Sequence, residues 1–102
     1  MLSEIKTALL TVSSNVGHYK ALKKIPPYIV WSEDGTNDPC AGDVHDDIVF
    51  TGTTDLFTNT ENDPLVDQIG AAFEAAGICW QLYSVQHEDD TGLIHYEWAW
   101  EA

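Results

Sequence analysis

The sequence predicts an α+β fold with a mainly antiparallel β-sheet of about four to five strands and two helices packed on one face. Apolar residues recur at helical spacing in only two segments, one near the N-terminus and one in the third quarter of the chain. The other ordered segments are rich in β-branched and aromatic residues, and a short turn joins the last of them into a hairpin. The predicted order is therefore helix, three strands, helix and two strands, in a single domain over residues 1–102.

The first half of the chain predicts one helix and two short strands. The helix spans residues 3–12, with Ser3 as its N-cap. Its apolar face consists of Ile5, Ala8, Leu9 and Val12. Residues 18–25 predict a short strand, and two prolines lead into a β-rich strand at residues 28–31. Residues 32–43 are polar and interrupted by glycine and proline, which predicts a loop.

The second half predicts a long strand and a closing hairpin. Residues 44–58 are rich in β-branched and aromatic residues, and Gly52 within them predicts a β-bulge. Residues 78–88 and 93–101 are both strand-like, and the polar turn between them predicts an antiparallel hairpin.

The segment at residues 63–77 gives the clearest helix signal. Asp63 is a good N-cap, Pro64 suits the first helical position, and Gly77 suits the left-handed stop. The predicted apolar stripe consists of Leu65, Ile69, Ala72, Phe73 and Ala76.

The last strand alternates between aromatic and polar residues. This alternation places Ile94, Tyr96 and Trp98 on the face that packs under the helices. Trp100 follows on the same face at the end of the strand, where order usually fades. Trp100 is therefore a candidate for contact with a neighbouring subunit.

The chain is acidic, and its few basic residues lie near one end. It has four lysines, no arginine and 17 acidic residues, for a net charge of −13. All four lysines lie in the first 24 residues, whereas residues 25–102 carry 16 acidic residues and no lysine or arginine. This distribution disfavours binding to nucleic acids and to anionic membranes, because both need an extended basic surface.

The basic segment suggests a contact between copies of the chain. Lys20, Lys23 and Lys24 are candidate subunit-interface residues, since they can meet an acidic surface of the next subunit. Such a contact joins two different faces and closes into a ring when the rotation permits. The alternative is that these lysines offset acidic residues of their own subunit.

No catalytic signature is found, so the sequence predicts a protein that is not an enzyme and has no cofactor or metal. Phosphate-binding glycine loops and nucleophile elbows do not occur. Two metal sites stay open as alternatives, a calcium site at residues 87–90 and a zinc site. The zinc site would use His45, His87 and His95. Cys40 and Cys79 lack metal-ligand spacing, and we expect free thiols in an intracellular protein without a signal peptide or membrane span.

Five stretches of the sequence together resemble one family. They are ALLTVSSNVGHY, PPYIVW, IVFTGTTDLFT, NDPLVDQIGAAFEAAGICW and SVQHEDDTGLIHYEWAWE. They are similar to the small tail-terminator and head–tail joining proteins of tailed phages, above all those of phages and prophages of Gram-positive bacteria. The resemblance runs from residue 4 to the end of the chain. Its most telling parts are the Pro-Pro-aromatic strand, the Thr-Asp-Leu-Phe strand before the Asp-Pro-capped helix, and the aromatic-Glu-aromatic closing strand.

This resemblance implies a non-enzymatic morphogenesis protein. In that family the subunits form a ring, commonly a hexamer, which ends the tail tube and faces the head connector. The implied partners are copies of the chain, the tail tube protein and head connector proteins, with DNA passing an acidic lumen without specific binding. The implied locations are the bacterial cytoplasm during assembly and then the neck or tail of the virion.

The high negative charge also allows a function from a different class. An acidic inhibitor that mimics DNA would place carboxylates where a nucleic-acid-binding enzyme expects phosphates. A mimic of this kind is usually a monomer or a dimer, whereas a tail terminator forms rings. Oligomeric state therefore discriminates the two hypotheses.

Overall fold

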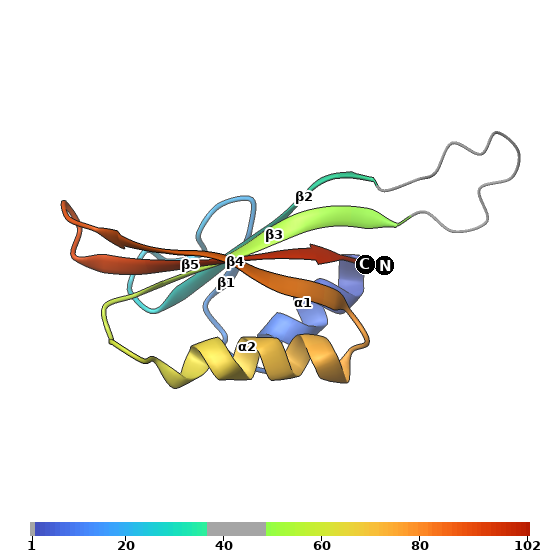
Figure 1. The fold of residues 1–102 in the computed structure, drawn as a ribbon, viewed down its shortest axis with the longest axis horizontal. Coiled ribbons are helices and arrows are strands. Elements are labelled where there is room, and N and C mark those ends of the chain that lie inside the picture. The colour runs from blue at the N-terminus through green and yellow to red at the C-terminus, as the bar shows by residue number, and fades with distance from the viewer. Residues whose placement is uncertain (1, 37–48) are drawn as a thin grey trace, which may run out of the picture.

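The computed structural model describes residues 2–36 and 49–102, and it confirms the predicted α+β fold and order of elements. The elements are α1 (Leu2–Leu10), β1 (Val16–His18), β2 (Tyr28–Thr36), β3 (Phe50–Thr58), α2 (Pro64–Ala75), β4 (Cys79–Glu88) and β5 (Leu93–Glu101). Both helices lie on the same face of the sheet (Figure 1). Neither helix of the described ranges is long and apolar enough to cross a membrane.

The five strands form one sheet in the order β1-β2-β3-β5-β4. β1 runs parallel to β2, whereas all other neighbours pair antiparallel. The sheet therefore has two unlike edges, since β1 has three residues and β4 has ten. The difference matters because the unpaired backbone groups of a long edge strand are available to another chain.

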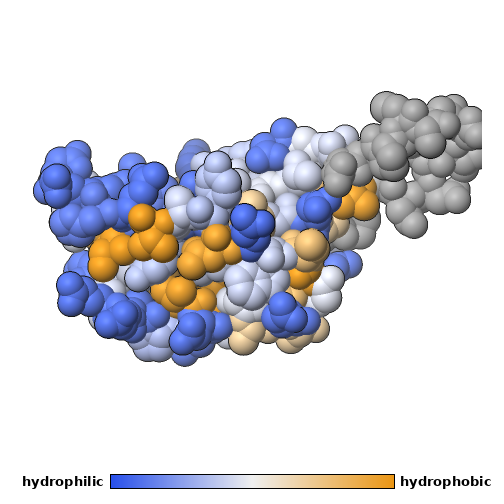
Figure 2. All heavy atoms as spheres, viewed as in Figure 1, coloured by the Kyte–Doolittle hydropathy of each residue, from blue (hydrophilic) through white to orange (hydrophobic). Residues whose placement is uncertain are grey.

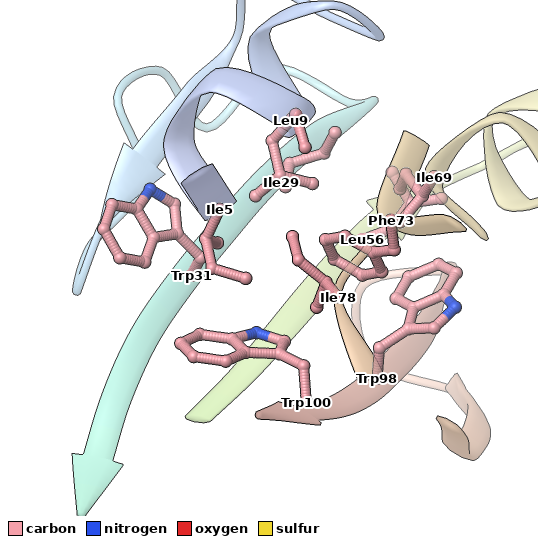
Figure 3. Packing of buried hydrophobic residues seen from close by; sticks show 11 residues of the cluster. Ile5, Leu9, Ile29, Trp31, Leu56, Ile69, Phe73, Ile78, Trp98 and Trp100 are labelled. Carbon is pink, nitrogen blue, oxygen red and sulfur yellow. The ribbon is translucent and has the colours of Figure 1, made fainter. Parts of the chain in front are cut away.

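The hydrophobic core lies between the helices and one face of the sheet (Figure 3). The helices contribute Ile5, Leu9, Ile69 and Phe73, all fully buried. The sheet contributes Ile29, Trp31, Leu56, Trp98 and Trp100. Each such side chain contributes about 1.5–3 kcal/mol through its removal from water. The opposite face of the sheet carries neither α1 nor α2, and we call it the helix-free face.

Local signals at both ends of α2 act as predicted. Asp63 accepts a hydrogen bond from the Leu65 backbone N–H at 2.9 Å, and Gly77 adopts a φ of +71°. The other carboxylate oxygen of Asp63 accepts from the buried Thr58 hydroxyl at 2.6 Å, which ties the helix start to the end of β3. Ala76, predicted on the apolar stripe, is instead exposed, because α2 ends at Ala75 and the chain turns away.

Two predictions in the first 25 residues need correction. The first helix lies where expected, but it begins at Leu2 and ends at Leu10, so Ser3 lies inside it and is not its cap. The strand predicted at residues 18–25 is wrong, because only His18 belongs to β1. The chain leaves the sheet at Tyr19, which adopts a φ of +70°.

The middle of the chain is more strand-like than the sequence predicts. β2 continues to Thr36 and pairs with β3, so the first five residues of the loop predicted at 32–43 are strand. The strand predicted at residues 44–58 is confirmed from Phe50 onward. Residues 37–48, which carry the rest of both predictions, lie outside the described residues.

The β-bulge predicted at Gly52 is wrong. The register shift lies in β2, between Glu33 and Gly35, on the strand opposite Gly52. Gly52 is needed for a different reason, because a Cβ there would lie 2.5 Å from the Trp100 ring and 2.4 Å from the Ser32 carbonyl oxygen. A glycine within a strand thus marks a close approach to the backbone here.

The closing hairpin of β4 and β5 is confirmed, but the role predicted for Trp100 is not. Trp98 and Trp100 are 1% and 2% exposed, and the Trp100 indole N–H donates to the Thr54 hydroxyl at 3.0 Å. The side chain of Trp100 is therefore part of the core of its own subunit and offers no surface to a neighbour. Ile94 and Tyr96 are only partly buried, nearer the hairpin turn.

Candidate functional site

A row of stacked rings crosses three strands of the helix-free face. The register pairs Tyr28 of β2 with Phe57 of β3, and Phe57 with His95 of β5. The ring centroids lie 4.8 Å apart for Tyr28 and Phe57 and 4.3 Å apart for Phe57 and His95, each pair 18° from parallel. Burial raises the pKa of Tyr28, and the nearby Glu88 carboxylate raises it further. The row fixes the plane of the His95 imidazole.

Carboxylates surround that imidazole. His95 Nε2 lies 2.7 Å from Asp55 Oδ1, and His95 Nδ1 lies 3.9 Å from Glu88 Oε2. Glu97 is the direct partner of Asp55 in the β3–β5 register. Potential ligand atoms of Asp55, His95 and Glu97 all lie within 4.8 Å of one another, and the three residues are partly buried. We call these three residues the acid–histidine cluster; chemically it can hold a proton or a cation.

A second surface follows β1, where residues 19–27 form a segment that we call the basic loop. Asn15 holds its backbone, since the Asn15 amide donates to the Lys23 carbonyl oxygen at 3.1 Å and accepts from the Lys23 N–H at 3.2 Å. A Cβ at Gly17 would lie 2.0 Å from the Lys20 carbonyl oxygen, so only glycine allows this approach. The conformation of the basic loop is therefore fixed at two points.

The basic loop exposes apolar side chains between its lysines. The predicted interface residues in it are Lys20, Lys23 and Lys24, all exposed. Its exposed apolar residues are Tyr19, Leu22 and Ile25, at 63–67%. Within residues 2–36 and 49–102, no carboxylate forms an ion pair with these three lysines. The alternative that they offset acidic residues of their own subunit thus has no support in that part of the chain.

His18 anchors the start of the basic loop to the sheet. Its ring stacks on Tyr19 at 4.1 Å and on Trp31 at 3.8 Å between centroids. His18 Nε2 also lies 2.6 Å from Glu33 Oε1. This hydrogen bond lowers the pKa of Glu33, while hydrogen bonding to Glu33 raises the pKa of the Tyr19 hydroxyl. The His18 imidazole therefore contacts both Tyr19 of the basic loop and Glu33 of β2.

The opposite edge of the sheet exposes an apolar strip on β4. We call its members, Leu82, Tyr83 and Val85, the β4 strip; they are 41%, 66% and 53% exposed. β4 contains no lysine and no proline, the residues that usually protect an edge strand from pairing. Acidic residues 88–90 follow it at the hairpin turn. Apolar side chains gather on this side between the β4–β5 hairpin and α2 (Figure 2).

The structure does not bring together the metal sites considered from the sequence. His87 pairs with Ile94, so His87 and His95 point to opposite faces of the sheet, and His45 lies outside the described residues. The acidic residues at the hairpin turn do not form a group of three converging ligands either. Among the described residues, the acid–histidine cluster is the one group that does. Cys79 is an exposed free thiol.

Comparison of the sequence with protein-family models and with curated protein sequences finds no match. The resemblance to tail terminators and head–tail joining proteins thus stays a prediction from the sequence. The structure shows two chemically different surfaces, the basic loop and the β4 strip, beside opposite edges of one sheet.

Proposed function

We propose that this protein is a non-enzymatic phage morphogenesis protein, a tail terminator or head–tail joining protein whose subunits form a ring at the end of the tail tube. The observation that carries the proposal is the position of the basic loop and the β4 strip beside opposite edges of one sheet. A contact between two different surfaces is heterologous, and its repetition generates a ring when the rotation closes. The element order and the resemblance of the sequence favour the same function.

The two surfaces are chemically complementary. The basic loop offers three lysines with apolar side chains between them, and the β4 strip offers apolar side chains followed by acidic residues 88–90. Apolar side chains at the centre of such a contact provide affinity, whereas the charges at its rim steer encounter and set orientation. The open backbone groups of β4 add hydrogen-bonding capacity to the same edge.

The charge of the remaining surface suits a ring through which DNA passes. Residues 25–102 contribute 16 acidic residues and no lysine or arginine. A passage lined by carboxylates repels the phosphate backbone, so the duplex slides without being held. Three of the four lysines of each subunit, Lys20, Lys23 and Lys24, are then occupied at the subunit interface.

Neutralising the lysines tests the contact. The variant Lys23→Gln/Lys24→Gln is expected to weaken self-association about tenfold, because two rim charges of the contact are lost. The matched control Gln68→Glu/Ala71→Glu makes the same change in net charge on exposed positions of α2 and is expected to assemble like the wild type. Light scattering over a concentration series measures both. If self-association weakened equally in the two variants, net charge would explain the effect and the proposed contact would be refuted.

Electron microscopy of mixtures with tail tube protein tests the function itself. The expected result is rings at the ends of tubes and tubes of limited length. A protein that stays monomeric at high concentration and never binds a tube end would contradict the proposal. If such a monomer inhibited a nucleic-acid-binding enzyme, the DNA-mimic function would replace it.

A further inference from the structure

We propose that Asp55, His95 and Glu97 bind one divalent transition-metal ion on the helix-free face, with Zn²⁺ as the ion of best fit. The three ligands lie outside the basic loop and the β4 strip, and only the neighbouring Glu88 also belongs to the acidic residues 88–90 of the proposed contact. One imidazole nitrogen and two carboxylates form a donor set that suits Zn²⁺ and its neighbours in the first transition row. Ca²⁺ and Mg²⁺ prefer oxygen ligands alone, so the imidazole selects against them.

The two carboxylates of the proposed site lie directly opposite each other in the sheet. Asp55 and Glu97 are direct partners across β3 and β5, where Cβ atoms of opposite residues lie about 4.5–5.5 Å apart. Like charges in this position destabilise a sheet. In a chain with a net charge of −13, a divalent cation between the two side chains removes this repulsion.

The His95 ring lies between two carboxylates and stacks on an aromatic ring. Nε2 faces Asp55 at 2.7 Å, and Nδ1 faces Glu88 at 3.9 Å. A metal-bound histidine usually directs its other ring nitrogen to a carboxylate, which fixes the tautomer and raises the basicity of the ligand. Phe57 stacks on the imidazole and holds its plane. The stacking therefore orients His95, and the Glu88 carboxylate lies near Nδ1 without a hydrogen bond to it.

Binding of Zn²⁺ requires only movements of side chains. Zn²⁺ bonds of about 2.0–2.1 Å in tetrahedral geometry separate two ligand atoms by about 3.3–3.4 Å. The Asp55 carboxylate must therefore move away from Nε2 by about 0.6 Å, which rotation of its partly exposed side chain provides. The other pairs of ligand atoms lie within 4.8 Å of one another, so rotation of the side chains has to bring them closer by up to about 1.5 Å. Water completes the coordination on the open side.

Calorimetric titration of the whole protein with ZnCl₂ in a buffer that does not chelate metals tests the site. The expected result is one Zn²⁺ per chain. His95→Ala is expected to lower the affinity at least about 100-fold, and Glu88→Gln, which removes the negative charge 3.9 Å from Nδ1, about 10-fold. Mg²⁺ in the same titration is expected to bind at least about 100-fold more weakly than Zn²⁺.

The control variant is His18→Ala/His87→Ala, which removes two other histidines and leaves the cluster intact. It is expected to bind Zn²⁺ like the wild type. If His95→Ala does not fold by circular dichroism, Glu97→Gln is used in its place and is expected to lose binding as well. The proposal is overturned if the wild type binds no Zn²⁺ at millimolar concentration. It is equally overturned if binding of unchanged affinity survives the change in the cluster, whatever the control variant does.

Discussion

Replacing Gly52 with alanine is expected to lower the free energy of unfolding by about 2–4 kcal/mol. The added Cβ would lie 2.5 Å from the Trp100 ring and 2.4 Å from the Ser32 carbonyl oxygen, so the indole has to move. Overpacking of this kind costs about 1–3 kcal/mol. Displacement also strains the hydrogen bond from the Trp100 indole to the Thr54 hydroxyl, which contributes about 1 kcal/mol. For a domain of this size, the melting temperature falls by about 8 °C or more.

Urea unfolding followed by circular dichroism measures the effect, with Gly35→Ala as the control. Among the described residues, a Cβ at Gly35 would meet only the Thr51 hydroxyl, at 3.5 Å, which is an ordinary contact. The control variant is therefore expected to stay within about 0.5 kcal/mol of the wild type. If Gly52→Ala were as stable as the wild type, or if both variants lost the same stability, the close approach of Trp100 would not explain the glycine.

The remaining predictions concern the start of α2 and the response to pH. Asp63→Ala is expected to cost about 1–2 kcal/mol through loss of the N-cap and of the partner of Thr58, whereas Asp67→Ala, one turn on and exposed, is expected to change little by thermal unfolding. Because the hydrogen bond from His18 lowers the pKa of Glu33 in the folded state, the stability it provides is present at neutral pH and is lost as the pH falls below 4.5 towards the folded pKa. His18→Ala is expected to flatten that acid limb of stability against pH, and an unchanged limb would refute the coupling.

Elements with strong local signals could be predicted from the sequence. The two ends of α2 are set by Asp63 and Pro64 at its start and by Gly77 after its end. These residues act through hydrogen bonds and backbone angles that depend on neighbouring residues alone. The closing hairpin is readable for the same reason, because its alternation and its turn lie in one continuous segment. Where sequence and local chemistry agree, a pattern predicts the element reliably.

Features that depend on single side-chain or close-packing contacts could not be predicted. Residues 18–25 carry a strand-like mixture of apolar and charged residues. They form a loop because the Asn15 side chain bonds to the Lys23 backbone and because Gly17, without a Cβ, lets the Lys20 carbonyl approach. From the sequence alone, the apolar side chains of this segment are therefore expected on the buried face of a strand, whereas in the structure they are exposed. Neither contact leaves a periodic signal in the sequence.

The acid–histidine cluster was missed for a related reason. Asp55 lies on β3, forty residues before His95, and only the β3–β5 register brings the two side chains together. The sequence instead suggests a group of His95 with His87, which is near in sequence but points to the opposite face. Side chains alternate between the two faces along each strand. Following this alternation across the predicted hairpin turn would have placed His87 and His95 on opposite faces.

Mixing two defective variants tests the proposed ring contact most directly. Leu22→Ser/Ile25→Ser removes exposed apolar side chains of the basic loop, and Val85→Lys places a positive charge on the β4 strip. Each variant alone retains only one of the two surfaces that a heterologous contact needs, so each is expected to stay monomeric by light scattering. An equimolar mixture restores one complete contact and is expected to give a one-to-one dimer that grows no further. Rings formed by either variant alone, or a mixture that stays monomeric while the wild type assembles, would contradict the account.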